Sequence, residues 1–372
     1  MWSKETLMRL IENNIPQVMD KIFELNDYIA LHPELGSEEF ESSKKIVNLL
    51  QNEGLDVIYP FDGMDTAFKA SINKGKKNKV ALLVEYDALP DIGHACGHCA
   101  SGMASIMAGL SLYLSKDEID AQIDLIGTPD EEMNGMKCLM ADHHVFDEYD
   151  FAAMVHMGGT NTLEVDFIAL TGLTFQFYGQ AAHAAQAPEK GRNALNAVRL
   201  LFDSVDMMRQ HVTSEARIHG YIKNGGNASN VVPDYTEAEF LARAPHTDEV
   251  KDIVDWMKDC GRAAALATRT EVKIQPLGEP FFDLHVSSEE KTILEECFKE
   301  VGLELSYEKF VGSSDIGNVD YICPAFHPVV SIGQELNVHT KEFADAMTNE
   351  QTHTGIVNGA KVLLNYMAIL QN

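Results

Sequence analysis

Long hydrophobic runs are absent from this sequence. The longest apolar stretch, residues 103–114, is short and is broken by small and hydroxyl-bearing residues, whereas a helix that crosses a bilayer needs about 20 consecutive apolar residues. The N-terminal stretch MWSKETLMRLIENN carries scattered charges and lacks the apolar core and cleavage site of a secretory signal. We therefore expect no membrane partner and a cytoplasmic location.

Cysteines and basic residues are also scarce. Six cysteines in 372 residues do not make a disulfide framework, so we expect reduced and mostly buried thiols. The chain has 29 Lys and Arg against 57 Asp and Glu, and the resulting net charge of −28 is spread along the sequence. An acidic surface of this kind repels polyphosphates, so nucleic acid is not an expected partner.

The order of patterns along the chain indicates two domains. Apolar, strand-like runs at 79–86, 122–128 and 151–157 alternate with helical patterns, which is typical of an α/β domain whose largely parallel sheet is covered by helices on both faces. Residues 168–278 instead follow the β-α-β-β-α-β order of a ferredoxin-like α+β domain. We expect one domain formed by 1–167 and 279–372, with the second inserted at 168–278.

Chemically active side chains gather where the three apolar runs end. The first run leads to Glu85, Asp87 and the segment DIGHACGHCASG (91–102), the second to PDEE (129–132), and the third contains His156. Ligands of open α/β sheets bind outside the carboxyl ends of the strands. Thiol, imidazole and carboxylate groups from separate segments are therefore expected at one sheet edge.

This mixture of sulfur, nitrogen and oxygen donors suits a borderline divalent cation, with zinc first and manganese, cobalt or nickel as alternatives. The adjacent pair Glu131-Glu132 allows a division of labour, in which one carboxylate binds metal and its neighbour is the general base for a water that the metal acidifies.

The sequence Cys96-Gly97-His98-Cys99 also spells the CGHC of thiol–disulfide exchange enzymes. Redox motifs of that kind follow a strand directly and open a helix, usually after an aromatic residue. Here Ala95 precedes the motif and a proline-containing loop separates it from the strand. A thiol oxidoreductase is thus kept only as a remote alternative.

Several segments together resemble the di-metal aminoacylase/carboxypeptidase superfamily. They are VEYDALPDIGHACGHCASG, GTPDEEMNG, MVHMGG, GQAAHAAQAPEKGRNALNA, NGGNASNVVPD and GSSDIGNVDYICPAFHP. The match runs from HPELGSEEF (32–40) to HTKEFADA (339–346) and is nearest to the amidohydrolase branch, which includes hydrolases of aminobenzoyl-glutamate, indole-acetyl-amino acids and β-alanyl dipeptides. The resemblance implies a metal-bearing α/β catalytic domain and a ferredoxin-like lid that forms a homodimer.

The resemblance also implies roles for individual residues. The ligands of a two-metal centre would be Cys96, His98, Glu132, His156 and His339. Glu131 would be the general base and Asp87 would orient a ligand. In the lid, His183 would polarise the substrate carbonyl from the partner chain, and Asn230 and Arg243 would hold the substrate. Two positions depart from the pattern: Glu85 stands where the wider superfamily has a metal-binding His, and Cys99 where close relatives have Asp or Asn.

We accordingly expect a metal-dependent hydrolase that cleaves the amide bond of a small-molecule substrate, an N-acyl amino acid or a dipeptide. The alternative from another class is a non-catalytic metal-binding or regulatory protein on the same scaffold. The sequence does not identify the acyl group or the amino acid.

Overall fold

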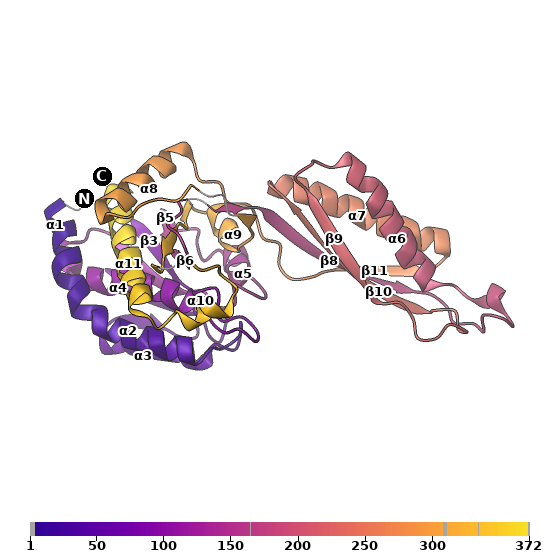
Figure 1. Cartoon of the computed structure of the whole chain (residues 1–372), viewed down its shortest axis with the longest axis horizontal. Coiled ribbons are helices and arrows are strands. Elements are labelled where there is room, and N and C mark those ends of the chain that lie inside the picture. The colour runs from indigo at the N-terminus through magenta and orange to yellow at the C-terminus, as the bar shows by residue number, and fades with distance from the viewer. Residues whose placement is uncertain (1–3, 164, 308–310, 334, 371–372) are drawn as a thin grey trace. The chain divides into compact units, whose positions relative to one another are not determined.

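The structure is a computed structural model that describes residues 4–163, 165–307, 311–333 and 335–370. It contains two compact units, one made of Met1–Asp166 with Leu284–Asn372 and the other of Phe167–Asp283 (Figure 1). The expected domain boundaries, at residues 168 and 278, remain a prediction.

A mixed six-stranded sheet forms the centre of the first unit, with the strand order β1-β2-β4-β3-β5-β13. β3 pairs in parallel with both β4 and β5, and β13 continues the parallel pairing beyond β5. β1 and β2 extend one edge of the sheet in antiparallel orientation, which the sequence patterns did not indicate. The strands are β1 (Asp56–Ile58), β2 (Phe68–Ile72), β3 (Lys79–Val84), β4 (Gln122–Gly127), β5 (Phe151–Ala153) and β13 (Ala325–Phe326).

Both faces of β3 and β4 are buried, as expected for central strands of an α/β sheet. The long helix α4 (His98–Tyr113) packs on β3 and is covered in turn by α2 and α11. The helices of this unit are α1 (Lys4–Arg9), η1 (Leu10–Asn14), α2 (Ile15–Leu31), α3 (Phe40–Asn52), α4, η2 (Lys116–Glu118), α5 (Met136–Asp142), α8 (Ser288–Val301), α9 (Ile316–Asp320), α10 (Lys341–Asp345) and α11 (Glu350–Leu370).

One expected strand is divided in the structure. Residues 151–157 do not form a single strand, because the chain leaves the main sheet after β5 and starts β6 (His156–Gly158). β6 pairs in parallel with β14 (Val329–Ser331) in a separate two-stranded sheet. Met154 and Val155, between the two strands, are buried like their neighbours, so the apolar pattern could not reveal the break.

The second unit is a four-stranded antiparallel sheet, β11-β8-β10-β9, with α6 and α7 packed on its apolar face. Its order β8-α6-β9-β10-α7-β11 is ferredoxin-like, which confirms the expected fold class. The elements are β8 (Ala169–Tyr178), η3 (Pro188–Lys190), α6 (Ala194–Met208), η4 (Arg209–His211), β9 (Arg217–Asn224), β10 (Tyr235–Ala244), α7 (Thr247–Thr268) and β11 (Glu271–Pro276), and the short strands β7 (Asp166–Phe167) and β12 (Val311–Gly312) complete the chain.

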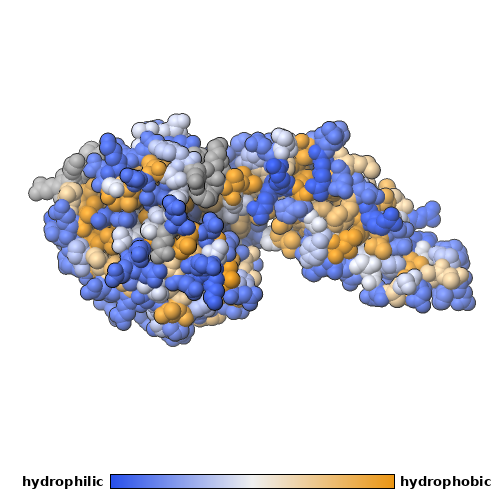
Figure 2. Space-filling model, viewed as in Figure 1, coloured by the Kyte–Doolittle hydropathy of each residue, from blue (hydrophilic) through white to orange (hydrophobic). Residues whose placement is uncertain are grey.

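Hydrophilic side chains dominate the visible face of the molecule, and hydrophobic ones are scattered among them (Figure 2). Within the part of the chain that the structure describes, none of the helices has both the length and the apolar character for a bilayer span. All six cysteines are free thiols, and all are buried.

Candidate active site

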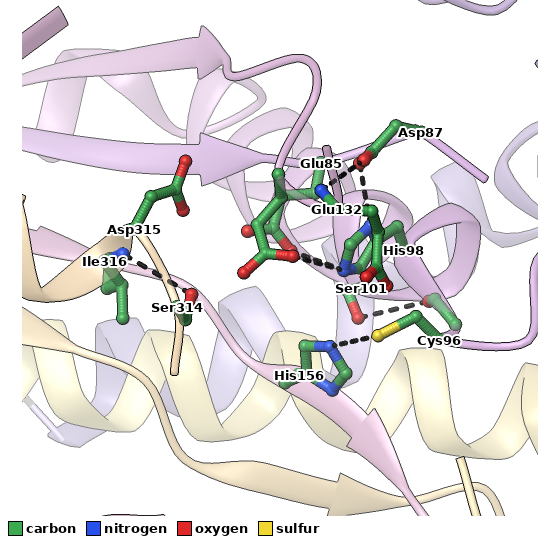
Figure 3. Close-up of polar contacts among 12 residues, drawn as sticks. Glu85, Asp87, Cys96, His98, Ser101, Glu132, His156, Ser314, Asp315 and Ile316 are labelled. Atoms are coloured by element: carbon green, nitrogen blue, oxygen red, sulfur yellow. Dashed lines mark hydrogen bonds and ion pairs between the residues drawn. The ribbon is translucent and has the colours of Figure 1, made fainter. Parts of the chain in front are cut away.

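The segment between β3 and α4 carries the centre of the site. Gly97 joins Cys96 to His98 with φ +89°, a left-handed conformation that glycine adopts without a steric penalty. A Cβ at Gly97 would lie 3.0 Å from the ring of Phe343. Glycine is therefore required both by the backbone and by the space, and the resulting turn brings the Cys96 thiol close to the His98 imidazole (Figure 3).

His98 is held by a carboxylate on one side. Its Nδ1 lies 2.7 Å from Oδ1 of Asp87, so Asp87 fixes the ring and leaves Nε2 for another partner. That Nε2 lies 3.5 Å from a Glu85 oxygen and 4.0 Å from a Glu131 oxygen. Burial opposes protonation of His98, but Cys96, Asp87 and Glu85 outweigh it and raise the pKa of the imidazole well above its usual value.

The expected metal ligands lie together in two overlapping groups. Cys96, His98 and His156 form one, and Cys96, Glu132 and His339 form the other, with donor atoms no more than 4.8 Å apart in each. The Cys96 sulfur is 3.3 Å from Nε2 of His156, and Nε2 of His339 is 3.6 Å from Oε1 of Glu132. The thiol of Cys96 is common to both groups.

These residues fit a pair of divalent cations. Within the described residues, the buried Nε2 of His98 and Oε1 of Glu132 have no hydrogen-bond partner, which is costly unless another ligand satisfies them. His156 uses its Nδ1 toward the Met157 carbonyl oxygen at 2.8 Å and keeps Nε2 for the site. The donor set of thiol, imidazole and carboxylate is the one expected for zinc or a related metal.

The two adjacent glutamates have different surroundings. Burial, followed by the negative charge of Asp315, raises the pKa of Glu131 well above its usual value. Burial acts in the same direction on Glu132, but His339 and His98 outweigh it and lower the pKa of Glu132 to about 2. Glu131 is thus the carboxylate that holds a proton readily, and Glu132 is the one that stays ionised.

A buried ion network lies behind these groups and was not predicted from the sequence. Nζ of Lys137 is 2.6 Å from Glu85 and 2.7 Å from Asp315, and all three side chains are at most 1% exposed. The Lys137 backbone N–H also donates to Asp315, at 3.0 Å. A lysine within the mostly apolar helix α5, MKCLMAD, is the one sequence signal that could have indicated a buried partner.

The structure shows what surrounds Glu85 and Cys99, the two residues that depart from the superfamily pattern. The Glu85 carboxylate forms an ion pair with Lys137 and belongs to none of the ligand groups found among the described residues. Cys99, in the first turn of α4, is fully buried in the hydrophobic core, and burial raises the pKa of its thiol to about 12.

The thiol environment also argues against the redox alternative. Reactive cysteines of exchange enzymes have lowered pKa values and partial exposure. Burial instead raises the pKa of Cys96 well above its usual value, and Cys99 is shifted in the same direction.

The expected substrate-binding residues belong to the second unit and do not form one cluster. His183 and Asn230 are neighbours, because His183 bridges to Val231 and the Ala184 N–H donates to the Asn230 carbonyl at 3.0 Å. Both side chains are exposed. Arg243 lies near the other end of β10, opposite Leu170 and Arg217 in the ladder.

Comparisons with known proteins identify the family of this chain. A family model described as a peptidase dimerisation domain, of the M20 type, matches residues 169–268. The chain is 31% identical to the Xaa-Arg dipeptidase of Mus musculus, covering 96% of this chain and 88% of that protein. It is 32% identical to one chain of the p-aminobenzoyl-glutamate hydrolase of Escherichia coli, over 72% of this chain and 60% of that one.

The fold agrees as well. A solved structure of a dinuclear metal binding peptidase from the M20 family of Bacillus subtilis superposes with a TM-score of 0.68 at 16% identity, covering 94% of this chain and 99% of that one. Together with the identity to the dipeptidase over nearly its whole length, this shows that the chain belongs to the M20 family of metallopeptidases and amidohydrolases.

Proposed function

We propose that this enzyme hydrolyses the amide bond of an N-acyl amino acid or a dipeptide-like substrate in the cytoplasm. The observation that carries the proposal is the pair of ligand groups sharing Cys96, with the protonatable Glu131 beside them. The names of the relatives, a dipeptidase and an aminobenzoyl-glutamate hydrolase, support this substrate class.

Two divalent cations are the proposed cofactors, with zinc as the first choice and manganese, cobalt or nickel as compatible alternatives. Cys96, His98 and His156 would hold one, and Cys96, Glu132 and His339 the other. Bound cations of this type supply Lewis acidity, which acidifies water and polarises a carbonyl oxygen. The dinuclear metal binding recorded for the Bacillus subtilis relative supports the stoichiometry.

Glu131 is the proposed general base. It takes a proton from the attacking water and returns that proton to the leaving amine, a pair of transfers that suits a carboxylate whose pKa is raised by burial and by Asp315. Asp87 keeps the His98 ring in place through the 2.7 Å hydrogen bond. His183 would donate to the carbonyl oxygen as negative charge develops on it, and Asn230 and Arg243 would hold the carboxylate or the carbonyl of the substrate.

We further propose that the site is completed by a second copy of the chain. β8 begins two residues after the chain enters the second unit, and its first residue, Ala169, lies opposite Ala244, next to Arg243. His183 and Asn230 lie beyond Tyr235 at the opposite end of β10, a separation of about 27 Å at ~3.4 Å per strand residue. Because His183 and Arg243 lie so far apart within one chain, a homodimer through this unit would let His183 act on the partner's substrate.

The test is a panel of N-acyl amino acids and dipeptides, assayed after chelation and return of zinc, manganese, cobalt or nickel. Glu131→Gln should keep two metals per chain and lose turnover by a factor of about 10² or more. Glu132→Gln is the matched variant and should lose metal as well. Unchanged turnover in Glu131→Gln would remove the assigned base, and no turnover of any substrate by the wild type would favour a non-catalytic binding protein.

A further inference from the structure

The residue directly before Glu131 has an unusual backbone. Asp130 has φ +58° although it is not glycine, and its side chain is fully buried. A non-glycine residue in the left-handed region costs energy and persists only where its surroundings hold it. The conformation of this peptide sets the direction in which the following Glu131 side chain leaves the backbone.

Several contacts of Asp130 come from the segment HPELGSEEF, which no step of the proposed reaction uses. The Ser37 hydroxyl donates to the Asp130 carboxylate, which also accepts the Asn134 backbone N–H at 3.1 Å. The carboxylate occupies the space beside Gly36, where an added Cβ would stand 2.1 Å from Oδ1. A glycine is therefore required at this position by the close approach of Asp130.

Glu39 holds the same peptide from its other side. Its side chain is fully buried; one oxygen accepts the Asp130 N–H at 2.8 Å, and the other accepts the Thr66 hydroxyl at 3.0 Å. Two residues further on, the Glu132 N–H donates at 3.0 Å to Asp87. The backbone is thus fixed by a buried carboxylate on each side of Glu131.

We propose that Glu39, held in place by the Thr66 hydroxyl, is a positioning residue for the Glu131-Glu132 pair. It acts through the Asp130 peptide and belongs to none of the ligand groups found among the described residues. This inference rests on the proposed role of Glu131. Misplacement of a reacting group by about 1 Å can cost a factor of about 10² in rate, so loss of the Glu39 hydrogen bond should lower kcat while leaving substrate binding nearly unchanged.

The variants are Glu39→Ala, Glu39→Gln and the matched control Glu38→Ala, since Glu38 is the exposed neighbour of the same residue type. A glutamine can accept the Asp130 N–H with its carbonyl oxygen and donate its amide to Thr66. Glu39→Ala should lower kcat at least about tenfold with KM within about twofold and metal content retained. Glu39→Gln should restore kcat to within about threefold of the wild type, and Glu38→Ala should have no effect.

A readout that needs no substrate is hydrogen exchange of a peptide spanning residues 128–135. Exchange should rise in Glu39→Ala and stay at the wild-type level in Glu39→Gln and Glu38→Ala. Unchanged exchange and kcat in Glu39→Ala would overturn the positioning role. If Glu39→Ala does not fold, Thr66→Val tests the same link, because it removes the hydroxyl that holds Glu39; wild-type kcat and exchange in that variant would overturn the proposal equally. Full turnover by Glu131→Gln would refute the proposed base instead, and so separates the two failures.

Discussion

Replacing Lys137 by methionine tests the buried ion network most directly. Methionine keeps much of the length of the side chain but removes the charge that lies 2.6 Å from Glu85 and 2.7 Å from Asp315. Removing one partner of a buried ion pair leaves an uncompensated charge and typically costs about 3–5 kcal/mol. Because two carboxylates share this one ammonium, we expect a loss of unfolding free energy at the upper end of that range.

The loss should depend on pH with a defined sign. Already in the native protein, burial raises the pKa of Asp315 to about 6 despite the neighbouring Lys137, and removal of the cation raises it further. A carboxyl group with a raised folded-state pKa favours the folded state at low pH and loses that contribution as the pH rises through the folded pKa. Lys137→Met should therefore be much less stable than the wild type at pH 8 and closer to it at pH 5.

The assay is urea unfolding of metal-free protein, followed by far-UV circular dichroism at both pH values. Lys76→Met is the matched control, because Lys76 pairs with Asp120 at 2.8 Å with both side chains exposed, and such surface pairs contribute about 0–1 kcal/mol. If Lys137→Met loses no more than Lys76→Met at pH 8, the charge argument is wrong. An equal loss at both pH values would indicate packing, and not charge, as the cause.

Three further predictions follow from the site and its surroundings. Cys96→Ser should reduce the metal content at both positions, whereas His339→Ala should reduce it at one, because Cys96 belongs to both ligand groups. Elemental analysis after dialysis against zinc measures the metal content of each variant. Equal losses of metal in the two variants would contradict a shared role for Cys96. Mixing His183→Ala chains with Glu131→Gln chains should restore part of the activity through mixed dimers, and an inactive mixture would contradict a site completed by the partner. Burial raises the pKa of Glu39 to about 8, so the stability that its protonated form contributes should fall as the pH rises from about 4.5 to 8. Urea unfolding at pH 5 and 8.5 should show this fall in the wild type but not in Glu39→Gln. An equal change of unfolding free energy in the two proteins would contradict the prediction.

Much of the site could be predicted because strand ends are visible in a sequence. The apolar runs that become β3 and β4 are followed by Asp87 and by Glu131-Glu132, and parallel strands of one sheet deliver such residues to one edge. His339 was different. Its backbone N–H donates to the Ala95 carbonyl at 2.7 Å, so a loop far along the chain is bound to the segment just before Cys96. No local sequence pattern encodes a contact between residues so far apart in the chain. Only the family resemblance indicated it.

The supporting residues could not be predicted, since burial of a charge depends on partners that the sequence does not place. Glu38 and Glu39 are adjacent and chemically identical, yet the first is exposed and the second fully buried. Lys137 is likewise one of many charged residues until Asp315, 178 positions away, is seen beside it. Periodicity identifies apolar faces, but it does not identify the buried charges that are stabilised by a specific opposite charge.

Two adjacent glutamates can have separate roles because different groups surround them. Before any cation is bound, the side chains of Glu131 and Glu132 are only 12% and 10% exposed, and this withdrawal from water by itself raises the pKa of each. The difference comes from their neighbours: Asp315 adds a negative charge near Glu131, and the imidazoles of His339 and His98 favour the ionised form of Glu132. Carboxylates whose surroundings move their pKa values apart are suited to different tasks. The Glu39–Asp130 and Asp87–Glu132 hydrogen bonds fix the backbone on both sides of Glu131. Each side chain is thereby kept in its own environment, as the proposed roles of Glu131 in proton transfer and of Glu132 as a ligand require.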